Sequence, residues 1–133
     1  MNAAFLDSLP EVRSDLDPAL AAGEKVVFAA RLACFGTETD AFLGGHTSKL
    51  YLTNRCLIAN NTVGLWTVEL ATDIASCAIV ENGIPFLKST VVRVDLNKEV
   101  VYGDGQGELR GFRFYLAKRD GDRFAALMDS ALR

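Results

Sequence analysis

Hydrophobic positions recur with two different periods along this chain. Near its N-terminus Leu9, Val12 and Leu16 are spaced three and four residues apart, which is typical of a helix with one apolar face. Ser8 and Glu11 stand three residues apart at the head of this run, in the pattern of a capping box. One kinked helix or two short helices are therefore predicted before residue 24.

The N-terminal segment, residues 1–23, contains further residues that are typical of helix starts and ends. Asp17-Pro18 repeats the helix-start pattern, and Gly23 can take the left-handed conformation that ends a helix. Phe5 and Leu6 lie upstream of the predicted helix start. They are expected either to fold back onto the domain or to contact a partner.

After this segment the period changes to two, which is the period of a β-strand. The first run, residues 26–34, is apolar on most of both faces, so we expect one long strand shared by two packed sheets. The next two runs, 48–53 and 55–60, meet so closely that they can only form a hairpin. Asn54 is predicted to take the left-handed turn position between them.

Five more runs with strand periodicity follow, separated by residues that favour turns. Asparagine tolerates a positive φ, and an Asn-Gly pair between strands is a strong hairpin signal. The predicted strands are residues 63–70, 75–81, 89–96, 99–102 and 109–117, and the predicted turns and loops are 36–47, Asn60-Asn61-Thr62, Asn82-Gly83, Asn97-Lys98 and 103–107. Seven or eight antiparallel strands are thus expected.

The helical period returns at the C-terminal end. Apolar residues recur at helical spacing on one face, namely Phe124, Leu127, Met128, Ala131 and Leu132. Asp120 or Asp122 is predicted to cap this helix. A single amphipathic helix after a run of strands must cover apolar surface that the sheets leave open. Burying its apolar face stabilises the domain by on the order of 8 kcal/mol, so deleting the helix is expected to unfold it.

Residues 49–59 read KLYLTNRCLIA, two apolar runs joined at Thr53-Asn54-Arg55. They resemble, with a one-residue contraction, the L-x-L-T-N-x-R-L-I hairpin of bacterial PH-like and GRAM-like domains of the pleckstrin-homology superfold. The other likenesses, in the same order as in the family, are Gly23-Glu24-Lys25-Val26-Val27, Asp73-Ile74 and residues 112–116. The resemblance implies a mainly β fold, a barrel of about seven antiparallel strands over residues 24–133 capped by the C-terminal helix, with residues 1–23 as a separate short helical segment.

The resemblance also implies a place to look for a ligand. Eukaryotic PH domains bind phosphoinositides through Lys and Arg side chains around the first hairpin. The corresponding candidates here are Arg31, His46, Lys49 and Arg55. Glu38 and Asp40 lie in the same loop, so specific phosphoinositide binding is disfavoured relative to solvated surface charge.

The distribution of charge changes this picture in one respect. Half of the 133 residues are hydrophobic, which argues against a disordered tail. The 14 basic and 17 acidic residues give a net charge of −3, which argues against broad nucleic-acid binding. Residues 1–24 hold five acids and one base, a balance of −4, so residues 25–133 hold twelve acids and thirteen bases, a balance of +1. The strand-rich body is nearly neutral, and the acidic N-terminal segment is a candidate docking element.

No catalytic set, cofactor or metal site is predicted. His46 is the only histidine, and the patterns G-x-S-x-G and H-E-x-x-H are absent. Cys34, Cys56 and Cys77 each sit in an apolar run without metal-ligand spacing, so they are predicted to be buried thiols. With no basic leader and no apolar run long enough to span a bilayer, a cytoplasmic protein without a transmembrane segment is expected.

These observations favour a non-enzymatic binding or assembly module whose partner is a protein, including a second copy of the chain. The candidate interface residues are Phe5, Leu6, Leu9 and Trp66. Two alternatives stay open. One is peripheral binding to an anionic membrane through the basic residues of the first hairpin, which is disfavoured, and the other is small-molecule binding at the mouth of the barrel. No nucleic-acid partner is expected.

Overall fold

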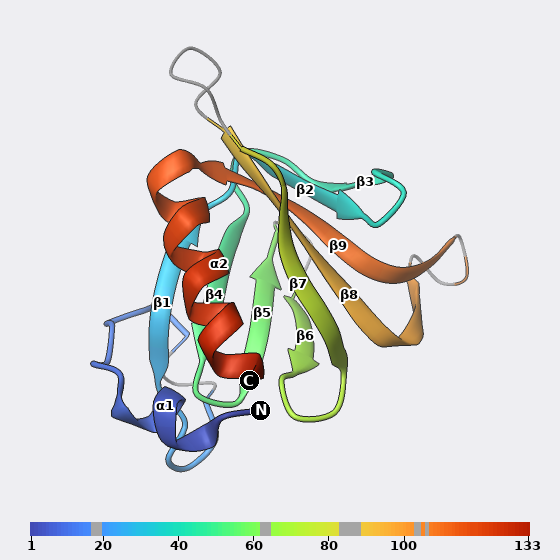
Figure 1. Cartoon of the computed structure of the whole chain (residues 1–133). Coiled ribbons are helices and arrows are strands. Elements are labelled where there is room, and N and C mark those ends of the chain that lie inside the picture. The colour runs from blue at the N-terminus through green and yellow to red at the C-terminus, as the bar shows by residue number, and fades with distance from the viewer. Residues whose placement is uncertain (17–19, 62–64, 83–88, 103–104, 106) are drawn as a thin grey trace.

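The computed structural model describes the whole chain except residues 17–19, 62–64, 83–88, 103–104 and 106. Its described residues form two antiparallel sheets and two helices (Figure 1). In chain order the elements are α1 (Ala3–Ser8), β1 (Val26–Arg31), β2 (Cys34–Thr37), β3 (Phe42–Gly44), β4 (Lys49–Thr53), β5 (Cys56–Asn60), β6 (Leu65–Glu69), β7 (Ile74–Glu81), β8 (Ser89–Tyr102), β9 (Gly107–Ala117) and α2 (Lys118–Leu132). The predictions for Asp17-Pro18, for Thr62, for Gly83 and for most of 103–107 lie outside the described residues.

The two sheets share one stretch of chain. The four-stranded sheet has the order β1-β4-β5-β6, and the five-stranded sheet has the order β3-β2-β9-β8-β7. β1 pairs with β4, and after a break at Leu32 and Ala33 the chain continues as β2, which pairs with β9. The prediction of one strand-like run shared by two sheets is confirmed, with the break marking the passage from one sheet to the other (Figure 1).

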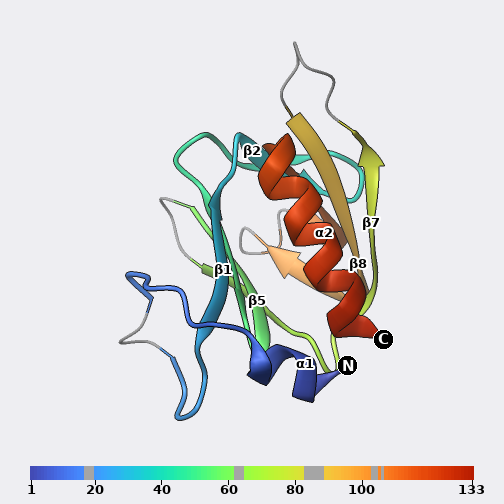
Figure 2. The same ribbon diagram turned by 60° about the vertical axis from the view of Figure 1, so that its left-hand side comes forward.

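α2 covers the opening between the two sheets, with β1 on one side and β7 and β8 on the other (Figure 2). The predicted apolar face is confirmed, with Phe124, Leu127, Met128 and Ala131 buried and Leu132 half-buried. The ring of Phe124 lies 5.6 Å from that of Phe28 in β1 and 6.1 Å from that of Phe114 in β9. One side chain of the helix thus joins both sheets.

The start of α2 differs from the prediction. The helix begins at Lys118 directly after β9, and its N-cap residue, Ala117, makes no side-chain capping bond. Asp122 is therefore not a cap, and its carboxylate lies 3.0 Å from the Lys118 ammonium one turn earlier. Because the strand runs straight into the helix, no separate capping loop is formed. Of the two helices described, neither is long and apolar enough to cross a membrane.

The N-terminal segment is also arranged differently from the prediction. α1 ends at Ser8, where a helix was expected to begin, and Asn2 caps it by accepting a hydrogen bond from the backbone N–H of Phe5 at 3.1 Å. The Ser8 hydroxyl donates to the Phe5 carbonyl at 2.6 Å, within α1. The residues after α1 are not helical as far as residue 16, because they lie along β1, where the N–H of Val12 donates to the carbonyl of Val26 at 2.8 Å.

The chain ends lie close together. The backbone N–H of Asn2 donates to the carbonyl of Ala131 near the end of α2 at 2.6 Å, and N and C are adjacent in both views (Figures 1 and 2). Leu6 of α1 is completely buried in the main core. The first residues of the chain are therefore an integral part of the folded domain.

The predicted hairpin of residues 49–59 is confirmed as β4 and β5, and Thr53 organises its turn. The Thr53 hydroxyl accepts hydrogen bonds from the backbone N–H groups of Arg55 and Cys56 at 3.0 and 2.8 Å. It donates in turn to a carboxylate oxygen of Glu24 at 2.6 Å. The threonine of the motif therefore both closes the hairpin and holds the chain that precedes β1.

Asn54 has a different role from the one predicted. Among the described residues other than glycine only Asp40 has a positive φ, at 66°, so Asn54 is not in the left-handed conformation. Its side chain instead accepts from the backbone N–H of Lys25 at 2.9 Å and donates to the Gly23 carbonyl at 3.1 Å and to the Asp7 carboxylate at 3.0 Å. These long-range bonds add to the local bonds of Thr53 and stabilise the turn without a left-handed conformation at Asn54.

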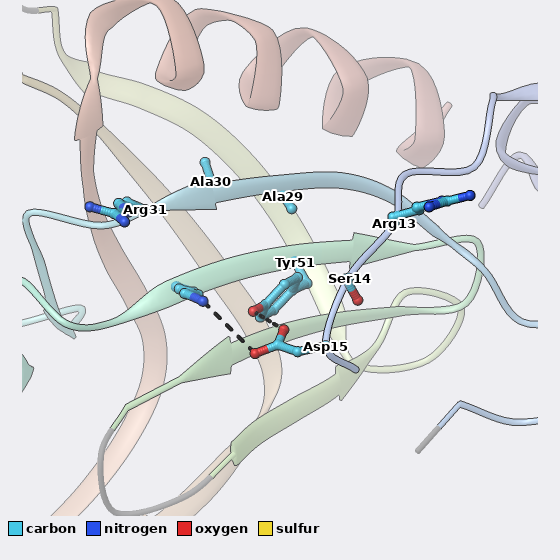
Figure 3. A pocket seen from close by; sticks show the side chains of 8 residues that line it. Arg13, Ser14, Asp15, Ala29, Ala30, Arg31 and Tyr51 are labelled. Atoms are coloured by element: carbon cyan, nitrogen blue, oxygen red, sulfur yellow. Dashed lines mark hydrogen bonds and ion pairs between the residues drawn. The ribbon is translucent and has the colours of Figure 1, made fainter. Parts of the chain in front are cut away.

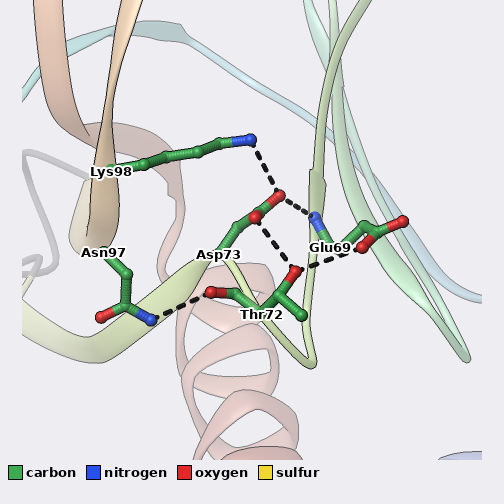
Figure 4. Close-up of polar contacts among 5 residues, drawn as sticks. All are labelled: Glu69, Thr72, Asp73, Asn97 and Lys98. Atoms are coloured by element: carbon green, nitrogen blue, oxygen red, sulfur yellow. Dashed lines mark hydrogen bonds and ion pairs between the residues drawn. The ribbon is translucent and has the colours of Figure 1, made fainter.

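The turn between β6 and β7 is held by the carboxylate of Asp73 (Figure 4). It accepts from the backbone N–H of Glu69 at 2.8 Å and lies 3.2 Å from the Lys98 ammonium. The amide of Asn97 donates to the Thr72 carbonyl at 3.2 Å. The hydrogen bond from Glu69 is the largest cause that lowers the pKa of Asp73.

Two strand predictions are corrected. The predicted turn at Asn97-Lys98 does not form, and β8 runs continuously through it, because both side chains bond to the neighbouring turn and a register shift between Asp95 and Val100 absorbs the irregularity. The expected loop 36–47 contains the short strand β3, which pairs with β2.

Candidate functional site

Three of the four predicted basic residues line one hollow. Arg31 at the end of β1 and Lys49 at the start of β4 are directly opposite each other across the strand pair. His46 lies in the turn just before β4, and with Thr47 and Ser48 these residues line a hollow of about 290 Å³. The positive charges of Arg31 and Lys49, directly opposite on paired strands, repel each other. An anion bound between them would relieve this repulsion, so the arrangement can bind an anion.

The fourth predicted residue, Arg55, lies elsewhere. Lys49 begins β4 and Arg55 follows its end, so at ~3.3 Å per residue they are separated by roughly 13 Å or more. Arg55 lines a different hollow, of about 490 Å³, together with Lys25 and Asn54. The strand between them keeps the two positions apart, so the four residues do not form one site.

A larger hollow of about 480 Å³ lies beside the first one and includes residues that the sequence did not indicate (Figure 3). Arg13 and Asp15 come from the N-terminal segment, and Ala29, Arg31 and Tyr51 come from β1 and β4. Their proximity follows from the path of the N-terminal segment along β1. No local sequence pattern could have revealed it.

Asp15 occupies part of this hollow. The Tyr51 hydroxyl donates to its carboxylate at 2.8 Å, and the Lys49 ammonium lies 3.8 Å from it (Figure 3). The hydrogen bond from Tyr51 is the largest cause that lowers the pKa of Asp15. Burial, followed by that hydrogen bond, raises the pKa of Tyr51 to about 12. Asp15 therefore holds the N-terminal segment against the sheet and supplies one counter-charge to the basic side chains.

The second candidate surface is the free edge of β7. This strand ends the five-stranded sheet, so only one of its edges is paired. Residues 75–80 carry no charge, and Ile79 and Val80 are 38% and 44% exposed. Unpaired backbone groups beside exposed apolar side chains form a surface onto which another strand can add.

The four predicted interface residues lie within the fold. Leu6 is completely buried, so its side chain has no surface left for a partner. Phe5 and Leu9 are partly buried against the main core. Trp66 packs edge-on against the rings of Tyr102 and Phe112, with centroid distances of 5.9 and 6.0 Å. Sequence reasoning missed Ile79 and Val80, although their place in an uncharged strand could have indicated them.

Comparison with known proteins bears on the fold. No family model and no curated protein matches this chain in sequence. Among solved structures, the Vps36 N-terminal PH domain aligns with a TM-score of 0.63 and 18% identity, over 93% of this chain and 90% of that one. The chain has the PH-domain fold. At this identity the likeness concerns the fold alone, and a bacterial GRAM-like affiliation stays a prediction.

The thiols of this PH fold are free and half-buried, which corrects the prediction that they are buried. Burial is the largest cause that raises their pKa values, to about 11 at Cys56 and about 12 at Cys77. Thiols with such pKa values hold little thiolate near neutral pH and are weak nucleophiles. Across the described part of the chain, no three His, Cys, Asp or Glu side chains are grouped so as to hold a metal ion.

Proposed function

We propose that this PH-fold chain is a non-catalytic binding module whose partner is a protein, and that the partner adds a strand to the free edge of β7. The observation that carries this proposal is the edge itself. β7 is eight residues long, and its positions 75–80 lack the charged side chains with which exposed edges are normally protected. A partner strand would gain main-chain hydrogen bonds together with contacts to Ile79 and Val80.

The other sheet edges are less suited to this role. β3 is only three residues long, and β6 is only five. β1 is six residues long, and its outer edge already receives a hydrogen bond from Val12 at Val26, so only the edge beyond Val26 is left for an added strand. β7 is the longest of these edge strands, and register shifts near both its ends leave a regular stretch at residues 76–79.

The occupant that we propose is a second copy of the chain, with the two β7 strands antiparallel. In such a pair the uncharged middle of one strand meets the uncharged middle of the other. The charged Glu81 of each strand would lie near the start of the opposite one rather than beside its counterpart. A two-fold contact of this kind is self-complementary, as closed dimers require.

Sedimentation equilibrium of the full chain up to tens of micromolar tests the proposal. We expect a reversible monomer–dimer equilibrium, and Ile79→Lys should shift it to monomer because a charge at the edge opposes strand pairing. The matched control is Val101→Lys, since Val101 is 59% exposed on β8 away from this edge. A monomer at all concentrations, or equal loss with both variants, would overturn self-association.

A second candidate function rests on the hollow that Arg31, His46 and Lys49 share, which favours an anionic ligand such as a membrane headgroup. Co-sedimentation with phosphatidylserine vesicles at low and physiological salt tests it, because an electrostatic site weakens as salt screens it. Binding should fall in the double variant Arg31→Gln with Lys49→Gln and persist in Arg55→Gln. Absence of binding at low salt would exclude this candidate.

A further inference from the structure

The arginines of this chain fall into two groups. Four of them, Arg93, Arg110, Arg113 and Arg133, lie in ion pairs with carboxylates. In the part of the chain that the structure describes, five others have no ion pair or side-chain hydrogen bond, namely Arg13, Arg31, Arg55, Arg119 and Arg123. Four of these five, all except Arg55, line two hollows that meet at Ala29.

We call Arg13, Arg31, Arg119 and Arg123 the arginine band. Arg13 and Arg31 line the hollow of about 480 Å³ on one side of Ala29. Arg119 and Arg123, from the first turns of α2, line a hollow of about 290 Å³ on its other side. Ala29 is small and exposed and lines both hollows, so the two adjoin and form one groove along β1, bordered by α2 and the N-terminal segment.

The arginine band is electrostatically unfavourable in the isolated domain. Arg31 faces Lys49 directly across β1 and β4, and Arg119 and Arg123 are four residues apart on one helix. Like charges at both kinds of spacing repel. Asp15 and Asp120 also line the hollows, but the arginines still outnumber them. The N-terminal end of α2 adds further positive potential. This surface therefore favours an anionic partner.

We infer that the groove binds an acidic, extended peptide segment of a partner protein, which lies along the outer edge of β1. β1 ends its sheet, so the edge beyond Val26 offers backbone groups to an added strand. Carboxylates on alternate sides of such a strand would meet Arg119 and Arg123 on one flank and Arg13 and Arg31 on the other. Guanidinium groups suit this role because they bind carboxylates with two hydrogen bonds.

Two other anionic partners fit the groove less well. A membrane presents a plane of charge, whereas these arginines flank a recessed groove on both sides. A single-stranded nucleic acid is held by stacking of its bases on exposed rings. The aromatic residues that line the two hollows, Phe28 and Tyr51, are 5% and 2% exposed and offer no such surface. The inference is independent of the proposed contact at β7, which lies on the other side of α2 (Figure 2).

Fluorescence anisotropy tests the inference with a labelled peptide in which pairs of adjacent glutamates alternate with pairs of valines, so that both sides of the extended strand carry carboxylates. We expect saturable binding by the full chain, weakened about tenfold or more in the double variant Arg119→Gln with Arg123→Gln, which removes two charge-assisted contacts. Arg55→Gln is the matched control, because Arg55 also lacks a partner among the described residues but lies outside the arginine band. Its affinity should equal that of the wild type.

A variant that leaves every charged residue in place distinguishes binding in the groove from general electrostatic attraction to the arginines. Ala29→Phe should fill the groove and weaken peptide binding, whereas diffuse electrostatic attraction would survive it. Circular dichroism spectra establish whether each variant is folded. If Ala29→Phe does not fold, Ala29→Ser serves as a smaller replacement at the same position. Ala29→Ser should retain binding. No saturable peptide binding by the wild type, equal weakening by Arg55→Gln, or binding only to phosphatidylserine vesicles or a DNA oligonucleotide would each overturn the inference.

Discussion

The side chain of Asn54 accepts a hydrogen bond at 2.9 Å from the backbone N–H of Lys25, a residue 29 positions earlier in the chain. The same amide donates to the Gly23 carbonyl and the Asp7 carboxylate. Asn54 is 7% exposed and Lys25 is half-buried, so the Lys25 N–H would lose its acceptor with only limited access to solvent. One side chain of the hairpin thus fixes the N-terminal segment and the entry into β1.

Replacement of Asn54 should therefore destabilise the domain. Asn54→Ala leaves the Lys25 N–H without an acceptor, and we expect the free energy of unfolding to fall by about 2–3 kcal/mol. Urea denaturation followed by circular dichroism measures it. The control is Arg55→Ala, whose guanidinium group forms no bond within the described residues and whose loss should change stability by less than ~0.5 kcal/mol. Equal effects would contradict the anchoring role.

Replacing Gly121 in α2 by alanine is predicted to lower stability, the opposite of the usual effect of this substitution in a helix. Replacing a helical glycine by alanine normally stabilises a helix by about 1 kcal/mol. Here the added Cβ would stand 2.6 Å from Cβ and 2.8 Å from Cγ2 of Thr90 in β8. We expect Gly121→Ala to destabilise the domain by about 1–3 kcal/mol through overpacking. Thermal melts of the two proteins decide the sign.

The exposed face of the same helix supplies the comparison. Ala126 is exposed, so Ala126→Gly should lose only the intrinsic helix preference, about 1 kcal/mol. Both variants are thus expected to be less stable than the wild type although their substitutions are opposite. Stabilisation by Gly121→Ala would show that α2 is packed less closely against β8 than described.

Tyr51 should contribute to loss of stability at alkaline pH. Burial, followed by the hydrogen bond to Asp15, raises its pKa in the folded protein to about 12, whereas an unfolded chain ionises near pH 10. The unfolded state then releases a proton that the folded state retains. The contribution of Tyr51 is fully present below pH 10 and is lost as the pH rises through 12.

Denaturation curves measured at intervals between pH 9 and 12 test this contribution. The raised thiol pKa values of Cys56 and Cys77 act in the same direction, so the comparison is between the wild type and Tyr51→Phe in the same background. The unfolding free energy of Tyr51→Phe should fall less steeply above pH 10. Identical slopes would mean that Tyr51 ionises as freely in the folded protein as in the unfolded chain.

The thiols should differ in their rates of alkylation. Burial raises the pKa of Cys77 to about 12 and that of Cys56 to about 11, and it also raises the pKa of Cys34. Since the thiolate is the reactive form, Cys77 should react most slowly with iodoacetamide at mildly alkaline pH. Mass spectrometry of peptides measures the order, and denaturant should remove it. Rapid labelling of Cys77 would show that β7 separates readily from α2.

Features that depend on neighbours in sequence could be predicted. The period of two in residues 49–53 and 56–60, with a tight join between them, allowed only the hairpin that β4 and β5 form. The spacing of Phe124, Met128 and Ala131 defined the buried face of α2 in the same way. In both cases side-chain burial follows the local repeat of the backbone.

Features that depend on contacts between distant segments could not be predicted. Ser8 and Glu11 carry a helix-start signal, but the chain beyond them runs along β1, where its hydrogen bond to Val26 and the burial of Leu16 outweigh a local cap. Arg31 and Lys49 became neighbours through strand register, whereas Arg55, close to Lys49 in sequence, was carried to the other end of β4. Arg13 and Arg119 belong to segments that only the complete fold brings to the same groove.

The hydrogen bond from Asn2 to Ala131 has a consequence for how the domain can be joined to other chains. With both ends at one corner, a short linker could close the backbone into a ring, and new ends could be opened at an exposed turn without stretching the fold. The whole domain could equally be inserted into a loop of another protein. Fluorophores or purification tags attached at either end would leave from the same corner.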